Sequence, residues 1–166
     1  MKTFALLLIA GTTVAVSAGQ SAPPKQNDQP SNKLLSLSIS VPEQTVTIGS
    51  EVKVKTNLTN ITDHVLNFFD SNPDCDYWAE LRDDKGDPVP ATDYKRQLKC
   101  SGRLSDGRRI LVTLKPQESR ADEIELTRLY VLSRAGSYSL FVQRRLPKEL
   151  GEITVKSNTT TMNFTD

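Results

Sequence analysis

A strict alternation of apolar and polar side chains begins at residue 34 and constrains the fold more than any other feature of the sequence. The apolar residues at every second position are Leu35, Leu37, Ile39 and Val41. The same period of two recurs over residues 52–56. This is the side-chain period of a β-strand with one buried face. Further strands are predicted at 64–70, 77–82, 109–114, 121–127, 137–145 and 152–164.

Turn-forming residues separate these strands. Glycine or proline occurs in the connections at 48–50, 83–86, 115–116 and 135–136. No segment keeps a helical apolar stripe for three turns, and residues 127–134 favour one helical turn at most. Short strands spaced by roughly 8–12 residues are typical of two packed antiparallel sheets.

The N-terminus predicts export from the cell. Residues 1–18 combine Lys2, an apolar stretch and small residues before Ala18, which is the pattern of a cleaved signal peptide. Residues 19–33 are rich in Pro, Gln, Asn and Ser and predict a disordered leader. The folded domain is therefore expected at 34–166, in a protein that is extracellular, or periplasmic in a Gram-negative bacterium. We expect no membrane-spanning segment.

Charge balance limits the partners. The full chain has 21 basic and 20 acidic residues, and removal of Lys2 with the signal peptide leaves equal numbers. Nucleic-acid binding needs a basic excess, so we expect no such partner. We expect a monomer.

Two aromatic residues make the sandwich prediction more specific. Tyr138, in the stretch 136–140, resembles the tyrosine corner of immunoglobulin-like domains, and Trp78 is expected between the sheets as a core tryptophan. The prediction is an all-β, immunoglobulin-like antiparallel β-sandwich of about seven to nine strands. Val54 and Leu140 are expected at the inward positions that cysteines occupy in antibody domains.

The C-terminal half also resembles a known group of modules. Segments 114–119, 124–126, 136–140 and 157–159 are similar to small secreted immunoglobulin-like modules. These include intracellular-proteinase-inhibitor-like domains and the β-sandwich pro-regions of some secreted metalloproteases. The motifs are structural, so the resemblance implies a fold rather than an activity.

The only two cysteines, Cys75 and Cys100, are expected to form a disulfide, because the export signal directs them to an oxidising compartment. A bond that closes segment 75–100 stabilises by about 3.5 kcal/mol in the chain-entropy treatment. The alternative is a pair of redox-active thiols, but the spacing is not Cys-x-x-Cys.

A basic segment adjoins the second cysteine. Residues 93–109 contain six basic residues against Asp93 and Asp106. The six are Lys95, Arg96, Lys99, Arg103, Arg108 and Arg109. One interpretation is a solvated loop balanced by the acidic residues of 70–87. The other is a contact surface for an acidic protein surface or an anionic glycan.

Patterns for catalysis and metal binding are weak. Asp70, Asn72 and Asp74 begin a calcium-loop pattern, but Cys75 stands where glycine is required. His64 is the sole histidine, and the sequence contains no Gly-x-Ser-x-Gly motif that would supply a serine nucleophile for it to activate. We therefore expect that the protein is not an enzyme and that it binds no cofactor and no metal ion. Asn57, Asn60, Asn158 and Asn163 lie in sequons, which matter only in a glycosylating host.

The sequence thus predicts a secreted, non-catalytic binding module with a disulfide-bonded basic loop. The alternative is a proteinase inhibitor that acts through residues 96–109, with Arg96, Lys99 or Arg103 in a trypsin-like pocket.

Overall fold

The structure is a computed structural model that describes residues 34–98, Cys100 and residues 109–166. Contacts divide the chain into two units, Met1–Ser31 and Asn32–Asp166, and all described residues belong to the second. The predicted signal peptide and leader lie outside the described residues. So do three of the predicted contact residues, Lys99, Arg103 and Arg108.

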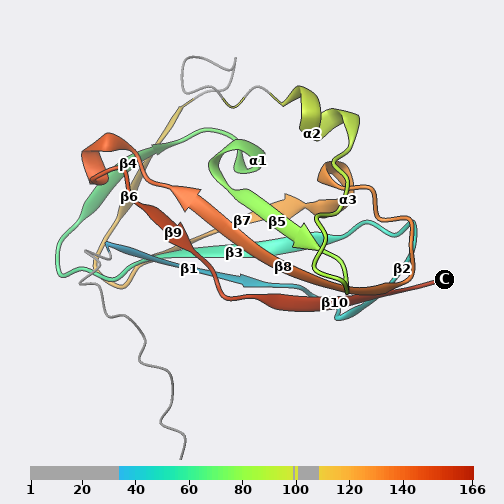
Figure 1. Ribbon diagram of the computed structural model, residues 1–166. Helices are drawn as coiled ribbons and strands as arrows, with labels where there is room; N and C mark the ends of the chain where they lie inside the picture. Colours follow the sequence, from blue (N-terminus) through green and yellow to red (C-terminus); the bar gives the residue numbers. More distant parts are fainter. Residues whose placement is uncertain (1–33, 99, 101–108) are drawn as a thin grey trace, which may run out of the picture. The chain divides into compact units, whose positions relative to one another are not determined.

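Strands dominate the described chain and form two main sheets and a ribbon (Figure 1). The first sheet has the order β1 (Leu35–Ser40), β3 (Lys53–Asn60), β7 (Ser119–Glu125) and is antiparallel. The second has the order β2 (Thr45–Thr47), β10 (Thr160–Thr165), β8 (Gly136–Arg145), β5 (Trp78–Arg82), and β9 (Thr154–Lys156) also pairs with β8. The ribbon pairs β4 (Leu66–Asp70) with β6 (Ile110–Leu114).

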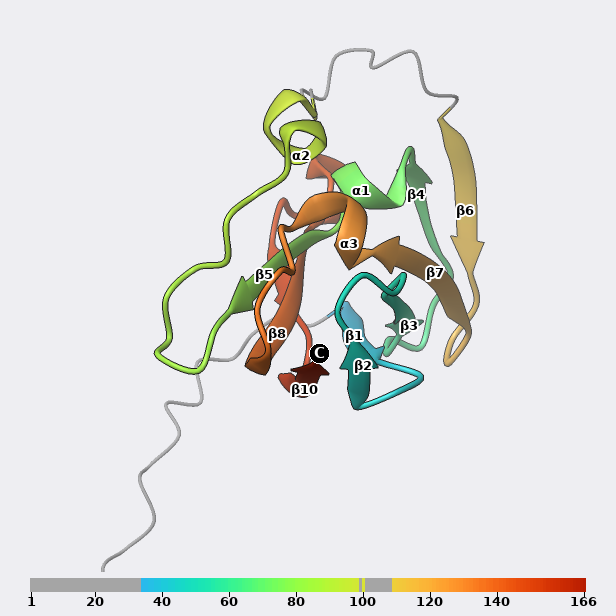
Figure 2. The same cartoon turned by 90° about the vertical axis from the view of Figure 1, so that its right-hand side faces the viewer.

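The two sheets pack face to face around an apolar core. In the view of Figure 2, β5 and β8 lie on one side of the core and β3 and β7 on the other. The alternating inward residues of both sheets are buried, including Val54 and Leu140, which are both fully buried as expected. Every pairing within these sheets is antiparallel except that of β2 with β10. The predicted immunoglobulin-like β-sandwich is confirmed.

The single strand expected at residues 152–164 is instead two strands, β9 and β10, with a break at residues 157–159. The break has a polar cause. The Asn158 side chain accepts a hydrogen bond from Ile39 N (2.9 Å) and donates one to Ile39 O (3.2 Å), so it bonds to β1 of the other sheet. Ser157 Oγ accepts from Val142 N (2.9 Å). The Ser157 side chain therefore takes a backbone donor of β8 that a continuous strand would pair.

Tyr138 is buried, and its hydroxyl donates a hydrogen bond of 2.9 Å to Arg134 O. Its ring meets the ring of Phe164 edge-on, with 5.2 Å between centroids. The predicted tyrosine contact is therefore present.

The expectation that Trp78 packs between the sheets is wrong, since this side chain is 63% exposed. Alternation along β5 explains the difference. Tyr77, Ala79 and Leu81 point inward and are buried, so Trp78 belongs to the outward set. The core position is filled by Tyr77.

Three short helices lie together at one end of the domain (Figure 2): α1 (Pro73–Asp76), α2 (Asp93–Gln97) and α3 (Leu126–Leu129). A 3₁₀ turn, Lys148–Leu150, follows β8. Asn72 caps α1 by accepting from Asp74 N (3.1 Å), and Thr92 caps α2 by accepting from Lys95 N (3.2 Å). α3 overlaps the helical turn expected at 127–134. No helix among the described residues is both long and apolar enough to cross a membrane.

Candidate functional site

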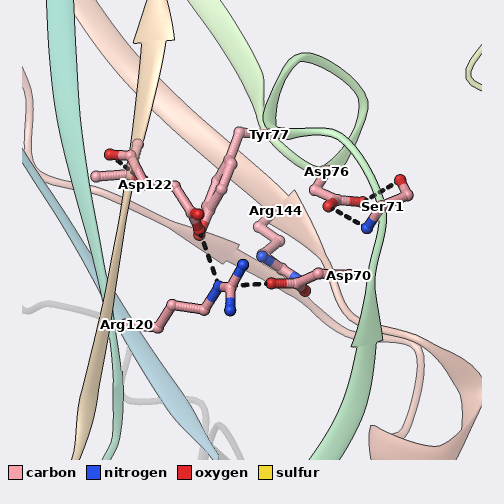
Figure 3. Close-up of polar contacts among 8 residues, drawn as sticks. Asp70, Ser71, Asp76, Tyr77, Arg120, Asp122 and Arg144 are labelled. Carbon is pink, nitrogen blue, oxygen red and sulfur yellow. Dashed lines mark hydrogen bonds and ion pairs between the residues drawn. The ribbon is translucent and has the colours of Figure 1, made fainter. Parts of the chain in front are cut away.

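A buried ion cluster supports the end of the domain that carries the helices (Figure 3). Asp70, at the end of β4, lies between Arg144 of β8 and Arg120 of β7. Arg120 Nε is 2.8 Å from Asp70 Oδ2, and Arg144 Nη2 pairs with Asp70 Oδ1. The guanidinium of Arg144 also lies 4.9 Å from the ring centroid of Tyr77. Charge pairing therefore joins the ribbon to both sheets just before α1 begins.

Two further contacts hold α1 in place (Figure 3). Asp76, its last residue, accepts hydrogen bonds from Ser71 N (2.8 Å) and Ser71 Oγ (2.9 Å). Tyr77 follows the helix and donates to Asp122 Oδ2 of β7 (3.0 Å). Burial raises the pKa of Tyr77 to about 12, so its hydroxyl remains a hydrogen-bond donor at neutral pH.

The predicted disulfide joins Cys75 of α1 to Cys100, with 5.1 Å between their Cα atoms. A second link lies beside it. Asp74 Oδ2 accepts a hydrogen bond from Tyr94 of α2 (2.8 Å) and pairs with Arg128 of α3. The buried carboxylate of Asp74 therefore connects all three helices.

The residues of the calcium-loop pattern are engaged in other contacts. The carboxylates of Asp70 and Asp74 are buried and paired with arginines, and Asn72 caps α1. Among the described residues, no group of three or more His, Cys, Asp or Glu side chains could hold a metal ion.

A cleft of about 520 Å³ opens beside the disulfide, between β5 and the segment that leads into α2. Its lining is mainly apolar and includes Leu81, Val89, Leu98, Leu129 and Tyr130. Both disulfide cysteines also line it. Its volume lies within the range of roughly 300–1,000 Å³ that is typical of small-molecule sites.

Lys95 extends from α2 into this cleft and is half-buried. Its Nζ donates to Ala79 O (3.3 Å) and to the hydroxyl of Tyr130. The same nitrogen lies 3.7 Å from the ring centroid of Tyr130 and 5.1 Å from that of Trp78. Burial lowers the pKa of Lys95 to about 8, while the charge of Glu80 opposes this shift. Lys95 therefore remains mostly protonated at neutral pH.

The structure divides the six basic residues predicted as a contact surface. Lys95 and Arg96 line the cleft, whereas Arg109 is exposed and does not. Arg96 pairs with Asp93 and donates to Ala91 O. Lys99, Arg103 and Arg108 lie outside the described residues.

Sequence reasoning missed two important residues of the site. Trp78 was expected in the core but lines the cleft, and Tyr130 was not singled out. The alternation Tyr77–Ala79–Leu81 contained the signal for Trp78, because it places the tryptophan on the opposite face of β5. No local pattern indicated that Tyr130 would meet Lys95, 35 residues away.

The four sequons differ in their environments. Asn60 is fully buried, and its amide donates to His64 O (2.8 Å) and Leu114 O (2.9 Å), so a glycan there is incompatible with this fold. The Asn158 amide is bonded to Ile39. Asn57 and Asn163 are exposed.

Comparisons with known proteins yielded similarities among solved structures. No family model and no curated protein sequence matches the chain. The CARDB domain of a Pyrococcus furiosus protein aligns with a TM-score of 0.41 and 10% identity, over 79% of this chain and 87% of that one. A β-glucosidase from Listeria innocua, in complex with laminaribiose, aligns with a TM-score of 0.40 and 14% identity, over 80% of this chain. A β-glucosidase from Erythrobacter marinus aligns with a TM-score of 0.41 and 10% identity, over 79% of this chain.

The matched regions of the two glucosidases are 16% and 15% of those chains. At these TM-scores the similarities identify neither a family nor a function. The immunoglobulin-like sandwich is defined by the chain's own strand pairing and burial. The resemblance to proteinase-inhibitor-like domains and metalloprotease pro-regions stays a prediction.

Proposed function

We propose that this protein is a secreted, non-catalytic binding module and that its contact surface is the disulfide-bonded end of the sandwich. One observation carries the proposal: Trp78 is 63% exposed and lies beside Lys95 and the disulfide. Tryptophan, tyrosine and arginine are enriched among the residues that dominate binding energy at interfaces. Tyr94 and Arg96 lie on the same end.

The rigidity of this end supports the proposal. The disulfide fixes α1 to Cys100, and Asp74 fixes α2 and α3 to α1 through Tyr94 and Arg128. A surface held in one geometry before binding loses less conformational entropy when the partner docks.

The charge of this end favours an acidic protein surface as the partner. Lys95 has no carboxylate within 4.0 Å among the described residues, and the exposed guanidinium of Arg96, which pairs with Asp93, lies on the same helix. The proposal includes no catalytic step, and the sole histidine, His64, is not among the residues that line the cleft. His64 is exposed and bonds to Asp63 (3.1 Å).

The test is capture of a partner from the native extracellular medium on three immobilised proteins. These are the parent, Trp78→Ala, and Phe69→Ala as a control on the ribbon, where Phe69 is 53% exposed. We expect a partner that the parent and Phe69→Ala retain and Trp78→Ala loses. Retention should fall between 0.1 and 1 M NaCl, where the Debye length drops from about 10 to about 3 Å. An anionic glycan as the captured species would correct the partner class, and loss in Phe69→Ala alone would move the contact surface to the ribbon.

The alternative function, inhibition of a trypsin-like protease, needs a basic residue that enters the protease's specificity pocket. Arg96 lies in helical α2 with its guanidinium paired to Asp93, so it offers no extended, substrate-like segment. The disulfide at Cys100 favours Lys99, its neighbour, and Arg103 remains the second choice. Titration of the protein against trypsin tests this function, which requires Lys99→Ala or Arg103→Ala alone to abolish inhibition.

A further inference from the structure

We propose that the cleft beside the disulfide binds a small organic carboxylate with an apolar body, and that Lys95 holds the carboxylate. The proposal deepens the proposed function, on which it rests, because it assigns a ligand class to a cleft at the same end of the sandwich. Three properties support it: the charge inside the cleft, the lining of the cleft, and the number of donors available.

The first property is the charge of Lys95, whose hydrogen-bond acceptors among the described residues are neutral. Its Nζ donates to a backbone carbonyl, Ala79 O, and to the hydroxyl of Tyr130. Burial raises the pKa of Tyr130 to about 12, so its phenol carries no negative charge at neutral pH.

Among the described residues, no carboxylate forms an ion pair with Lys95, although the charge of Glu80 acts on it. Glu80 lines the cleft, but its carboxylate accepts from Arg82 Nε (2.9 Å). Asp74, which also lines it, is bonded to Tyr94 and Arg128. A partly desolvated ammonium without an opposite charge is unfavourable, and an anion from outside would compensate it.

The second property, the lining, defines the body of the ligand. The cleft holds about 520 Å³, enough for a small organic molecule, and its walls are mainly apolar. Leu81, Val89 and Leu129 offer no hydrogen bonds from their side chains, so they favour a hydrocarbon or aromatic body. Trp78 lines the same cleft while remaining largely exposed, so it contacts both the cleft and the solvent.

The third property, the number of donors, defines the head group. Among the described residues, Ala79 and Tyr130 engage two of the three N–H groups of Lys95, which leaves one to donate to a ligand. A doubly charged phosphate group is normally bound by several donors, often a bidentate arginine. Arg96 lines the cleft but is engaged by Asp93 and Ala91, so a singly charged carboxylate is the better match.

The probe is octanoate, and its matched neutral control is 1-octanol. Trp78 is the only tryptophan of the chain and lines the cleft, so its fluorescence reports binding directly. Calorimetry gives the affinity. We expect octanoate to change Trp78 emission saturably at neutral pH and to bind at least about tenfold more tightly than 1-octanol.

Variants separate the charge of Lys95 from general apolar binding. Lys95→Met keeps a long apolar side chain and should weaken octanoate binding by about tenfold or more, while 1-octanol binds as to the parent. Lys156→Met is the matched control, because Lys156 is exposed over Phe141 and does not line the cleft. Equal octanoate affinity of the parent and a folded Lys95→Met would overturn the proposal. So would equal affinity of the parent for octanoate and 1-octanol.

The same carboxylate chemistry occurs in a free acid and at the C-terminus of a peptide. A second arm therefore compares a short peptide that ends in leucine with its C-terminal amide. Tighter binding of the free-carboxylate peptide than of octanoate assigns the site to peptide C-termini, and the reverse assigns it to free acids.

The failure of this proposal can be distinguished from failure of the proposed function. If neither carboxylate binds but Trp78→Ala still abolishes capture of a macromolecular partner, only the ligand class is overturned. If that capture is also unaffected by Trp78→Ala, the proposed contact surface is wrong as well.

Discussion

The phenol of Tyr94 donates a hydrogen bond of 2.8 Å to Oδ2 of Asp74, and this contact holds α2 against α1 beside the disulfide. The guanidinium of Arg128 pairs with the same carboxylate oxygen and lies 4.7 Å from the Tyr94 ring centroid. The helix that carries Lys95 is therefore fixed by a polar contact as well as by the covalent bond at Cys100.

Replacement of Tyr94 by phenylalanine should measure this contact. Tyr94→Phe keeps the ring over Arg128 but removes the hydrogen bond, and we expect a loss of about 1 kcal/mol in the free energy of unfolding. Urea denaturation of the oxidised protein gives the value. Since Asp74 still has Arg128, a loss above about 3 kcal/mol would show that the hydroxyl has a larger role than this geometry implies.

The Cys75–Cys100 bond should make a larger contribution. Cys100→Ala removes a crosslink between residues 25 apart, and we expect a loss of about 2–4 kcal/mol, because the unfolded chain gains freedom. Intact-mass measurement after alkylation under non-reducing, denaturing conditions should find no free thiol. Two alkylated cysteines would refute the bond. The far-ultraviolet spectrum of Cys100→Ala should remain that of a β-sandwich, since the core lies elsewhere.

The buried pair of Asp70 and Arg144 should be sensitive to loss of one partner. Both side chains are about 3% exposed, so Asp70→Asn leaves a guanidinium buried without its main counter-charge. We expect a loss of about 3–5 kcal/mol. Asp63→Asn is the surface control, because Asp63 is fully exposed and should change stability by less than about 0.5 kcal/mol.

A double replacement tests the same interpretation of the pair. Asp70→Leu with Arg144→Met removes both charges and should recover most of the loss, since Arg120 keeps its contact with Asp122 at 3.3 Å. A double variant as unstable as Asp70→Asn, in urea denaturation, would mean that packing rather than an unpaired charge causes the loss.

Lys95 should make stability depend on pH in the alkaline range. Its pKa is about 8 in the folded protein, against the ordinary lysine value of 10.5 in the unfolded chain, so the buried ammonium opposes folding fully below pH 8. As pH rises from 8 to 10.5, Lys95 loses its proton in the folded state before it does so in the unfolded chain. The unfavourable contribution of the ammonium to the free energy of folding therefore decreases over this range. Lys95→Met should therefore unfold at a higher urea concentration than the parent at about pH 7, with a smaller difference at about pH 10. A difference that is constant over this range would contradict the shifted pKa.

The strands and their inward faces follow closely from the alternation of the sequence. Leu35, Leu37 and Ile39 are buried as the pattern predicts, and the strand at 109–114 begins one residue later, at Ile110. The wrong predictions rested on analogy with immunoglobulin domains or on composition, and not on the alternation of apolar and polar residues. An immunoglobulin-like core tryptophan was expected at Trp78, although the period of two along β5 places it outward.

The strand expected at 152–164 failed for a different reason. Its composition is that of one long strand, but the Ser157 hydroxyl accepts from Val142 of β8 and the Asn158 amide bonds to Ile39 in the other sheet. A side chain's use of a distant backbone group cannot be read from its neighbours along the chain.

The sequence by itself determined the fold class, the strand faces and the disulfide, because period-two burial, turn residues and a lone cysteine pair are local or composition-level properties. The tertiary structure decided the site. Lys95 lies in an apolar cleft because α2 packs against α3 and places the Lys95 ammonium at Ala79 and Tyr130, 16 and 35 residues away. The burial of Lys95 and its lowered pKa depend on which distant groups surround this one side chain, and chain order does not encode those distances.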